Sequence, residues 1–281
     1  MPRPVTWRLP PHVFFIGSAV FHYLGPAFAV LLFAQLAPLG VAWLRIASAA
    51  AVFALWRRPW RQVALLDAST RGSIVLLGAV LALMNASFYL AINRLPLATV
   101  GAIEFLGPVA LAVAGLASRR NLIALILAVG GVYVLTGVHI ATDALGLCFA
   151  FANCALFVLY VILGHRIAGD GGGAGIDRLS AAMLVAMLVA LPIGWRDALP
   201  AFSHPALLAA GAGVGICSSV IPYVCDQLAM ARLSRATFAF LLALLPATAT
   251  LIGILVLRQM PSLAEFAGIG LIIVAVAIHR G

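Results

Sequence analysis

Long apolar runs separated by short gaps constrain the fold of this chain more than any other feature of its sequence. A membrane-spanning helix needs about 20 mostly apolar residues. Only 9% of the 281 residues are charged, against about 25% in soluble domains, so the chain cannot cover a water-soluble globule. We therefore predict an all-α integral membrane protein with ten transmembrane helices, at approximately residues 12–33, 38–56, 72–92, 97–117, 121–137, 144–165, 179–194, 205–230, 236–257 and 263–279.

The arginines predict how the chain is oriented in the membrane. All 17 basic side chains are arginines, and an even number of spans leaves both termini on one side. With the termini in the cytoplasm, thirteen arginines fall in cytoplasmic gaps and ends, and only Arg94, Arg196 and Arg258 fall in outer gaps. This excess follows the positive-inside rule and supports both this orientation and the even number of spans. The arginines form no basic stripe, so we expect no nucleic-acid partner.

The two halves of the chain resemble each other in sequence. The segment RLPLATVGAIEFLGP (94–108) aligns with RLSRATFAFLLALLP (232–246) at a constant offset of 138 residues. At the same offset, Gly130 aligns with Gly268 without a gap. The chain therefore contains an internal repeat whose unit holds five predicted spans.

Because five is an odd number, the second unit must enter the membrane from the side opposite to the first. We therefore predict two inverted five-helix repeats, at residues 1–137 and 138–281. Inverted repeats with a site at their interface are typical of transporters. We interpret the glycine-rich segment 169–175 as a flexible linker, because it lacks the residues of a phosphate-binding loop.

One carboxylate and several prolines lie inside predicted spans. A charge such as Glu104 costs about 2.5–3.5 kcal/mol at the centre of a span on insertion scales, so it is expected to face the protein interior or a wet cavity. Each proline removes the hydrogen bond to the carbonyl four residues earlier; Pro222, for example, frees the carbonyl of Ser218. Free backbone groups are tolerated where they line a cavity. The candidate hinges are Pro26, Pro108, Pro222 and Pro246.

Polar and aromatic residues recur at helical spacing on several spans and predict an aromatic-walled cavity. The stripes are Ser18, His22 and Pro26; Asn85, Phe88 and Tyr89; Asn153, Phe157 and Tyr160; and Ser219, Tyr223, Asp226 and Gln227. The candidate substrate-binding residues are His22, Asn85, Tyr89, Glu104, Asn153, Tyr160 and Tyr223. Glu104 is also the candidate proton carrier.

Several of these residues also have structural interpretations. Glu104 could handle the substrate or a proton, or it could serve only as the structural ion-pair partner of Arg45 or His22. Arg45 is interpreted as a structural cation with a fixed partner, and Asp226 as the partner of arginines near the cytoplasmic end of its span. No second histidine lies at ligand spacing from His22, so we expect no metal and no cofactor. Ser18 and His22 lie one turn apart, which is weak evidence for an intramembrane hydrolase, and we expect a protein that is not an enzyme.

Three segments resemble a known family of transporters. They are FAQLAPLGVAWLRIASAA (33–50), IEFLGPVALA (103–112) and SSVIPYVCDQLAMARL (218–233). With the repeat, they identify the chain as similar to the drug/metabolite transporter superfamily, in its ten-helix EamA branch, and closest to amino-acid exporters of the threonine/homoserine and aromatic type.

The chain departs from that exporter type at three positions. Val30 lies where the type often has a lysine, Leu245 where it has an acid, and Pro26 where it has a small residue. The resemblance therefore implies a less charged and more aromatic cavity.

The resemblance implies a function and a set of partners. We expect a multi-pass exporter of neutral and aromatic amino acids that works by alternating access in the bacterial inner (plasma) membrane. Its partners would be the small-molecule substrate and the lipid bilayer, and the chain would be a monomer or a weak homo-oligomer. The alternative is an exporter of cationic or aromatic drugs or of other small metabolites. Proton antiport and facilitated diffusion both remain open.

Overall fold

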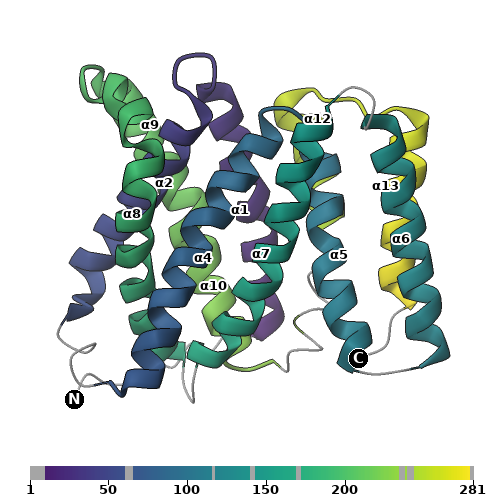
Figure 1. The fold of residues 1–281 in the computed structure, drawn as a ribbon, viewed down its shortest axis with the longest axis horizontal. Helices are drawn as coiled ribbons and strands as arrows, with labels where there is room; N and C mark the ends of the chain where they lie inside the picture. Colours follow the sequence, from purple (N-terminus) through teal and green to yellow (C-terminus); the bar gives the residue numbers. More distant parts are fainter. Residues whose placement is uncertain are drawn as a thin grey trace.

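The computed structural model describes residues 10–60, 66–115, 118–139, 143–168, 172–233, 238 and 244–278, and the regular structure within these residues is helical throughout. The helices stand side by side in one bundle (Figure 1). They are α1 (Pro11–Leu32), α2 (Pro38–Arg57), α4 (Ala68–Ile92), α5 (Leu97–Gly115), α6 (Arg119–His139), α7 (Ala144–Ala168), α8 (Gly172–Phe202), α9 (Pro205–Gly215), the π-helical turn η1 (Ile216–Val220), α10 (Ile221–Met230), α12 (Leu244–Leu257) and α13 (Leu263–Ile278).

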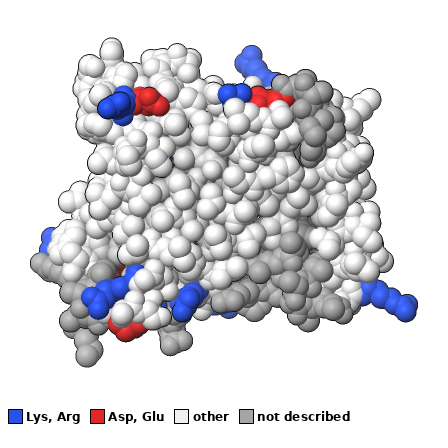
Figure 2. All heavy atoms as spheres, viewed as in Figure 1, with Lys and Arg blue, Asp and Glu red and all other residues white. Residues whose placement is uncertain are grey.

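The described helices have the length and composition of membrane spans. Six segments are long and apolar enough to cross a membrane: Val13–Leu32, Pro38–Arg57, Ala68–Ile92, Ala144–Ala168, Gly173–Phe202 and Pro205–Met230. Shorter apolar helices occur at Leu97–Gly107, Leu245–Leu257 and Leu263–Ala275. On the face shown in Figure 2, charged side chains lie at the two ends of the molecule and the band between them carries none. These features are those of a multi-pass membrane protein.

Helix α8 is much longer than the predicted span at 179–194. It has 31 residues and therefore measures about 46 Å at 1.5 Å per residue, more than the roughly 30 Å of a hydrocarbon core. Arg196, which the prediction placed in an outer gap, lies inside this helix. Residues 172–175 form its first turn, so the linker interpretation is wrong for them, and residues 169–171 lie outside the described part. Hydropathy detects only the apolar middle of such a helix.

Local sequence explains where several helices begin and end. Pro38 and Pro205 occupy the first turns of α2 and α9, where the missing N–H has no helical acceptor to lose. Asp67 caps α4 by accepting hydrogen bonds from the backbone N (2.9 Å) and the hydroxyl (2.6 Å) of Thr70. These bonds hold the pKa of the Asp67 carboxyl below its ordinary value. Arg58 ends α2 in the left-handed conformation, with φ of 49°.

The helices of the two halves pack against each other in a reciprocal pattern. Helix α1 contacts α10 and α12, and α7, the first helix of the second half, contacts α4 and α5. Helix α2 contacts α9 while α8 contacts α4, and the pairs α2–α8, α5–α12 and α6–α13 also meet. Figure 1 shows α6 and α13 side by side at one end of the bundle. A Cβ on Gly131 would lie 2.6 Å from the carbonyl oxygen of Gly268, so glycine permits the close approach of these two helices.

The eighth predicted span, 205–230, is interrupted in its middle. The π-helical turn η1 separates α9 from α10, and Pro222 lies in the first turn of α10. Small residues hold this turn close to its neighbours: a Cβ on Gly25 of α1 would lie 2.8 Å from Cα of Ser218, and one on Gly215 would lie 2.6 Å from the carbonyl oxygen of Arg45. By contrast, α1 continues through Pro26, so that proline does not interrupt its helix.

Candidate substrate site

Glu104 of α5 is buried and accepts hydrogen bonds from two other helices. The hydroxyl of Tyr23, on α1, donates to Oε2 at 2.8 Å, and Nδ2 of Asn153, on α7, donates to Oε1 at 2.9 Å. Nε2 of His22 lies 3.5 Å from Oε2. Of the two ion-pair partners that the sequence left open, the structure therefore brings His22 to Glu104 and not Arg45. These donors fix the position of the carboxylate.

Tyr23 is the residue of this group that sequence reasoning missed. Its side chain is fully buried and its ring lies edge-on to that of His22, with centroids 5.1 Å apart. The predicted stripe on α1 followed residues one turn apart and passed over the neighbour of His22. The signal was a hydrogen-bonding aromatic residue next to a histidine in an apolar helix, since a buried tyrosine hydroxyl usually has a partner.

Arg45 of α2 is held by the π-helical turn. Its Nε donates to Oγ of Ser219 at 2.8 Å, and its Nη2 donates to the carbonyl oxygen of Ser218 at 2.7 Å. That carbonyl is the one that the sequence expects Pro222 to free. The guanidinium carbon also lies 5.5 Å from the ring centroid of Tyr89. Arg45 therefore has fixed partners, as predicted, but every partner in the described part of the chain is neutral.

Asn85 and Tyr223 connect the arginine to the rest of the site. Nδ2 of Asn85 donates to the carbonyl oxygen of Leu81 at 2.7 Å and to the hydroxyl of Tyr223 at 3.3 Å. The same hydroxyl lies 3.5 Å from Nη2 of Arg45. Side chains from α2, α4 and α10 thus form one polar network.

A small cavity lies between these groups. It measures about 10 Å³, which is room for about one water molecule. It is lined by His22, Arg45, Met84, Asn85, Phe88, Glu104, Asn153 and Tyr223. Five of the seven predicted binding residues are therefore brought together, while Tyr89 lies under Arg45 and Tyr160 lies beside Asp226. Pockets for small molecules usually measure several hundred Å³, so this cavity is too small to hold a molecule much larger than water.

Asp226 has different partners from those predicted. It is 3% exposed and accepts hydrogen bonds from Oγ of Ser18 and from the hydroxyl of Tyr160, the latter at 2.6 Å. The expected pairing with arginines is wrong, because none of the ion pairs between described residues includes Asp226. The Ser18 hydroxyl is directed to this acid and not to His22, so the geometry of a serine–histidine pair is not formed.

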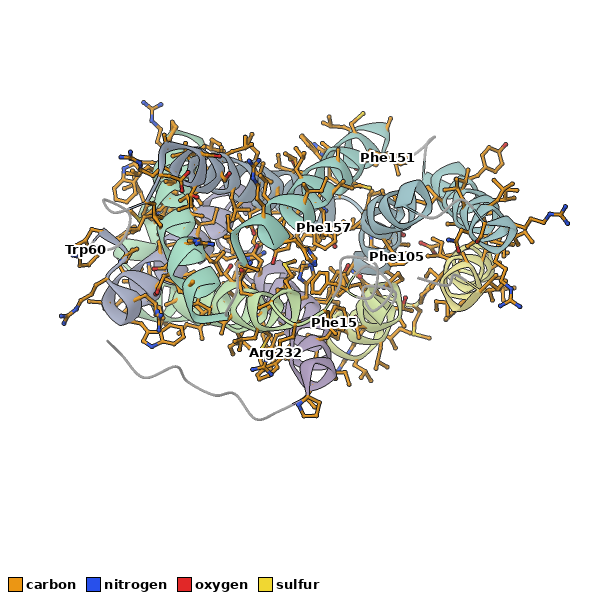
Figure 3. All side chains as sticks on the ribbon, turned by 90° about the horizontal axis from the view of Figure 1, so that it is seen from below. Phe15, Trp60, Phe105, Phe151, Phe157 and Arg232 are labelled. Atoms are coloured by element: carbon orange, nitrogen blue, oxygen red, sulfur yellow. The ribbon has the colours of Figure 1, made fainter. Side chains whose placement is uncertain are left out.

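Aromatic rings fill the space between the two acids. Phe157 of α7 stacks on Tyr160, with centroids 5.7 Å apart, and its ring lies 5.9 Å from that of His22. Figure 3 shows Phe157 among the helices, whereas Trp60 lies at the edge of the bundle. Among the described residues, no group of His, Cys, Asp or Glu side chains is arranged to hold a metal ion.

The remaining candidate hinges lie in helical backbone. Helix α5 continues through Pro108 to Gly115, and Pro246 is the third residue of α12. The carbonyl that Pro246 would free belongs to Leu242, which lies outside the described residues. Of the candidate hinges, only Pro222 follows an interruption of the α-helix within the described part of the chain.

Known proteins share the sequence and the architecture of this chain. Residues 144–280 match the model of the EamA-like transporter family. The chain is 31% identical to the "Threonine/homoserine exporter RhtA" of Escherichia coli (strain K12), over 89% of this chain and 84% of the relative. It is also 31% identical to the protein of that name from Salmonella typhimurium (strain LT2), over 84% of this chain and 79% of the relative.

The chain belongs to the EamA-like transporter family. A solved structure titled "Crystal structure of protein" has the same fold, with a TM-score of 0.62 over 95% of this chain and 96% of the other. That protein is 18% identical, so the likeness concerns the fold alone. Membership of the EamA-like family and the membrane-length helices together make the chain a multi-pass membrane transporter.

Proposed function

We propose that the chain exports amino acids across the bacterial inner membrane. The observation that carries the proposal is Glu104, a buried carboxylate that lines a cavity and is held there by donors from two other helices. Intramembrane carboxylates usually serve substrate or ion handling. An ammonium group of the substrate would compensate its charge. The similarity to exporters named for threonine and homoserine supports this substrate class.

Transport would proceed by alternating access between two inverted five-helix repeats, residues 1–137 and 138–281. The reciprocal packing supports this proposal, because exchanging equivalent helices of the two halves turns the contacts of α1 with α10 and α12 into those of α7 with α4 and α5, and the contact of α2 with α9 into that of α8 with α4. The cavity of about 10 Å³ is too small for an amino acid, so the two halves must move apart to admit one. The arginine distribution supports cytoplasmic termini.

The walls of the cavity support a substrate range that includes aromatic side chains. Phe88, Met84 and Tyr223 line it together with the polar groups. Methionine adapts its shape to different neighbours, and aromatic rings stack on one another. The family resemblance points the same way, because Val30 and Leu245 are apolar at positions where exporters of this type often carry a charge. Neutral amino acids of different sizes are therefore the proposed substrates.

Glu104 is also the proposed proton carrier if export is coupled to the proton gradient. Its carboxylate is in contact with His22, Tyr23 and Asn153, so a proton that replaced the substrate ammonium would be accommodated in the same network. Uniport and antiport differ in one observable: only antiport is driven by a pH gradient.

The test is uptake of labelled threonine, homoserine, phenylalanine and lysine into liposomes that contain the purified protein, with and without a pH gradient. Uptake of neutral and aromatic amino acids is expected. Glu104→Gln should abolish it, and dependence on the gradient in the wild type would show that export is coupled to protons. If folded wild-type protein takes up no amino acid but does take up cationic dyes, the proposal is wrong and the chain is a drug exporter.

The Glu104→Gln variant is expected to fold, which makes the test decisive. Oδ1 of Asn153 has no hydrogen-bond partner among the described residues. Turning the Asn153 amide end for end would present that oxygen to the new NH₂ group, while Tyr23 would still donate to the remaining oxygen. The variant would then lose the charge and keep the hydrogen bonds. Normal uptake by this variant would refute the role of Glu104.

A further inference from the structure

Arg45 is a buried cation without a carboxylate partner in the described part of the chain. The side chain is 3% exposed and lies in the middle of α2. The ion pairs between described residues join Arg57 to Asp177, Arg94 to Asp143 and His22 to Glu104. A buried charge with neutral partners alone is costly. An anion that enters the site would therefore be strongly favoured.

The neutral partners of Arg45 orient the guanidinium and hold two of its three nitrogen atoms. Nε and Nη2 are bound to Ser219 and to the carbonyl oxygen of Ser218, and Tyr89 lies beneath the group. Nη1 donates to no other described residue. The edge that Nη1 shares with Nη2 can bind both oxygens of a carboxylate once the long contact of Nη2 with the Tyr223 hydroxyl (3.5 Å) is exchanged for it, because the planar fork of arginine matches that geometry. The π-helical turn thus preorganises the cation, which lowers the entropic cost of binding.

Arg45 and Glu104 line the same cavity, although they come from α2 and α5. The cavity therefore carries one cation, Arg45, and one anion, Glu104. Among the described residues Arg45 has no carboxylate beside it, and Glu104 has only His22 as an ion-pair partner. An amino acid carries the complementary pair of charges on one carbon atom. The two residues together have the polarity that a zwitterion requires.

We propose that Arg45 binds the carboxylate of the transported amino acid while Glu104 binds its ammonium group. This proposal rests on the proposed export of amino acids and replaces the structural role that the sequence suggested for Arg45. It predicts that the site selects against amines that lack a carboxylate, because such a ligand would leave the buried guanidinium unpaired. Sites built to pair with a polar group discriminate strongly against analogues that lack it.

The experiment compares threonine with threoninol, in which a hydroxymethyl group replaces the carboxylate. Apparent affinities come from ligand-dependent thermal stabilisation of the detergent-purified full chain. In the wild type, threonine is expected to bind about tenfold more tightly than threoninol or better, since hydrogen bonds to charged groups contribute about 1.5–3 kcal/mol. In Arg45→Gln, the two ligands are expected to bind equally well, because the substitution lowers the affinity only for threonine, the ligand that has a carboxylate.

A matched control separates binding from support of the fold. Arg57→Gln removes the other arginine of α2, which pairs with Asp177 and does not line the cavity, so its preference for threonine should persist. An unchanged preference in Arg45→Gln overturns the proposal. If that variant does not fold, Arg45→Lys keeps the charge without the fork, and its preference should fall severalfold; an unchanged preference there also overturns the proposal.

The wild type distinguishes this inference from the proposed function. Equal binding of threonine and threoninol to wild-type protein would refute the role of Arg45 and leave amino-acid export intact. If neither threonine nor any other amino acid binds to folded wild-type protein, the proposed function itself fails.

Discussion

Replacing Gly25 by alanine should disturb the π-helical turn directly. A Cβ at this position would overlap Oγ of Ser218, which can rotate away, and would lie 2.8 Å from Cα and Cβ of the same residue, whereas carbon atoms pack at about 3.5 Å or more. Helix α1 and the turn must therefore separate by about 0.7 Å in Gly25→Ala. Overpacking of this kind costs about 1–3 kcal/mol, and the better helix propensity of alanine offsets at most about 1 kcal/mol of it.

The displacement should affect transport as well as stability. The carbonyl oxygen of Ser218 accepts the 2.7 Å hydrogen bond from Arg45, so moving the turn moves a group that positions the cation. We expect Gly25→Ala to lower the melting temperature by several degrees and to weaken threonine binding. Both effects should reverse in part when Ser218→Gly is added, because that change removes the Ser218 side chain from the clash.

The assay is thermal unfolding of purified protein, with threonine uptake into liposomes as the second readout. Gly213→Ala is the matched control, since a Cβ there would meet no heavy atom within 4 Å and α9 would only gain helix propensity. The reasoning is refuted if Gly25→Ala melts at the same temperature as Gly213→Ala and transports equally well.

Two further variants test the groups around the acids. Tyr23→Phe removes the donor to Oε2 of Glu104 and should cost up to about 1.5–3 kcal/mol of stability. Threonine binding should persist, because Asn153 still holds the carboxylate. Lost binding with an unchanged melting temperature would contradict this expectation. Asp226→Asn should lower the melting temperature without changing threonine affinity, because Asp226 does not line the cavity. Normal melting and binding with lost uptake would instead place Asp226 in the transport cycle.

The sequence predicted the parts of this fold that depend on local composition. The apolar runs predicted the positions of the membrane-length helices, and Pro222 predicted a carbonyl without a helical donor near Ser218. The sequence could not identify Arg45 as the donor to that carbonyl, because the contact joins two helices far apart in the chain. The extent of α8 was missed for a different reason: its ends are polar and look like loops to a hydropathy argument.

The errors at the site have a common physical origin. The sequence left Arg45 and His22 as equal candidates for pairing with Glu104, since spacing within one helix does not define the distance between helices. Asp226 was assigned to arginines near the end of its span, but α1 and α7 bring Ser18 and Tyr160 to it. Hydroxyl donors can supply the hydrogen bonds that a buried carboxylate needs, and they are hard to predict because serine and tyrosine occur throughout such helices.

Contacts between equivalent residues support the inverted repeat more directly than the sequence alignment does. Residues that lie near a two-fold axis meet their own counterparts. At the offset of 138, Asn85 corresponds to Tyr223, and these two side chains lie 3.3 Å apart. In the outer pair of helices, α6 and α13, Gly130 corresponds to Gly268. The next residue, Gly131, is the one that approaches Gly268 closely. Both contacts are expected if an axis in the membrane plane relates the halves.

The charges of the site do not follow this symmetry. Glu104 corresponds to Leu242 in the second half, and the cation of the cavity, Arg45, also belongs to the first half. The second half contributes Asn153 and Tyr223 to the cavity wall, which are neutral groups. If the two halves rock against each other, the charged ends of an amino acid would stay with α2 and α5 of the first half, while the weaker contacts of the second half are broken. A symmetric backbone can therefore provide the motion, and asymmetric charges can determine which half holds the substrate.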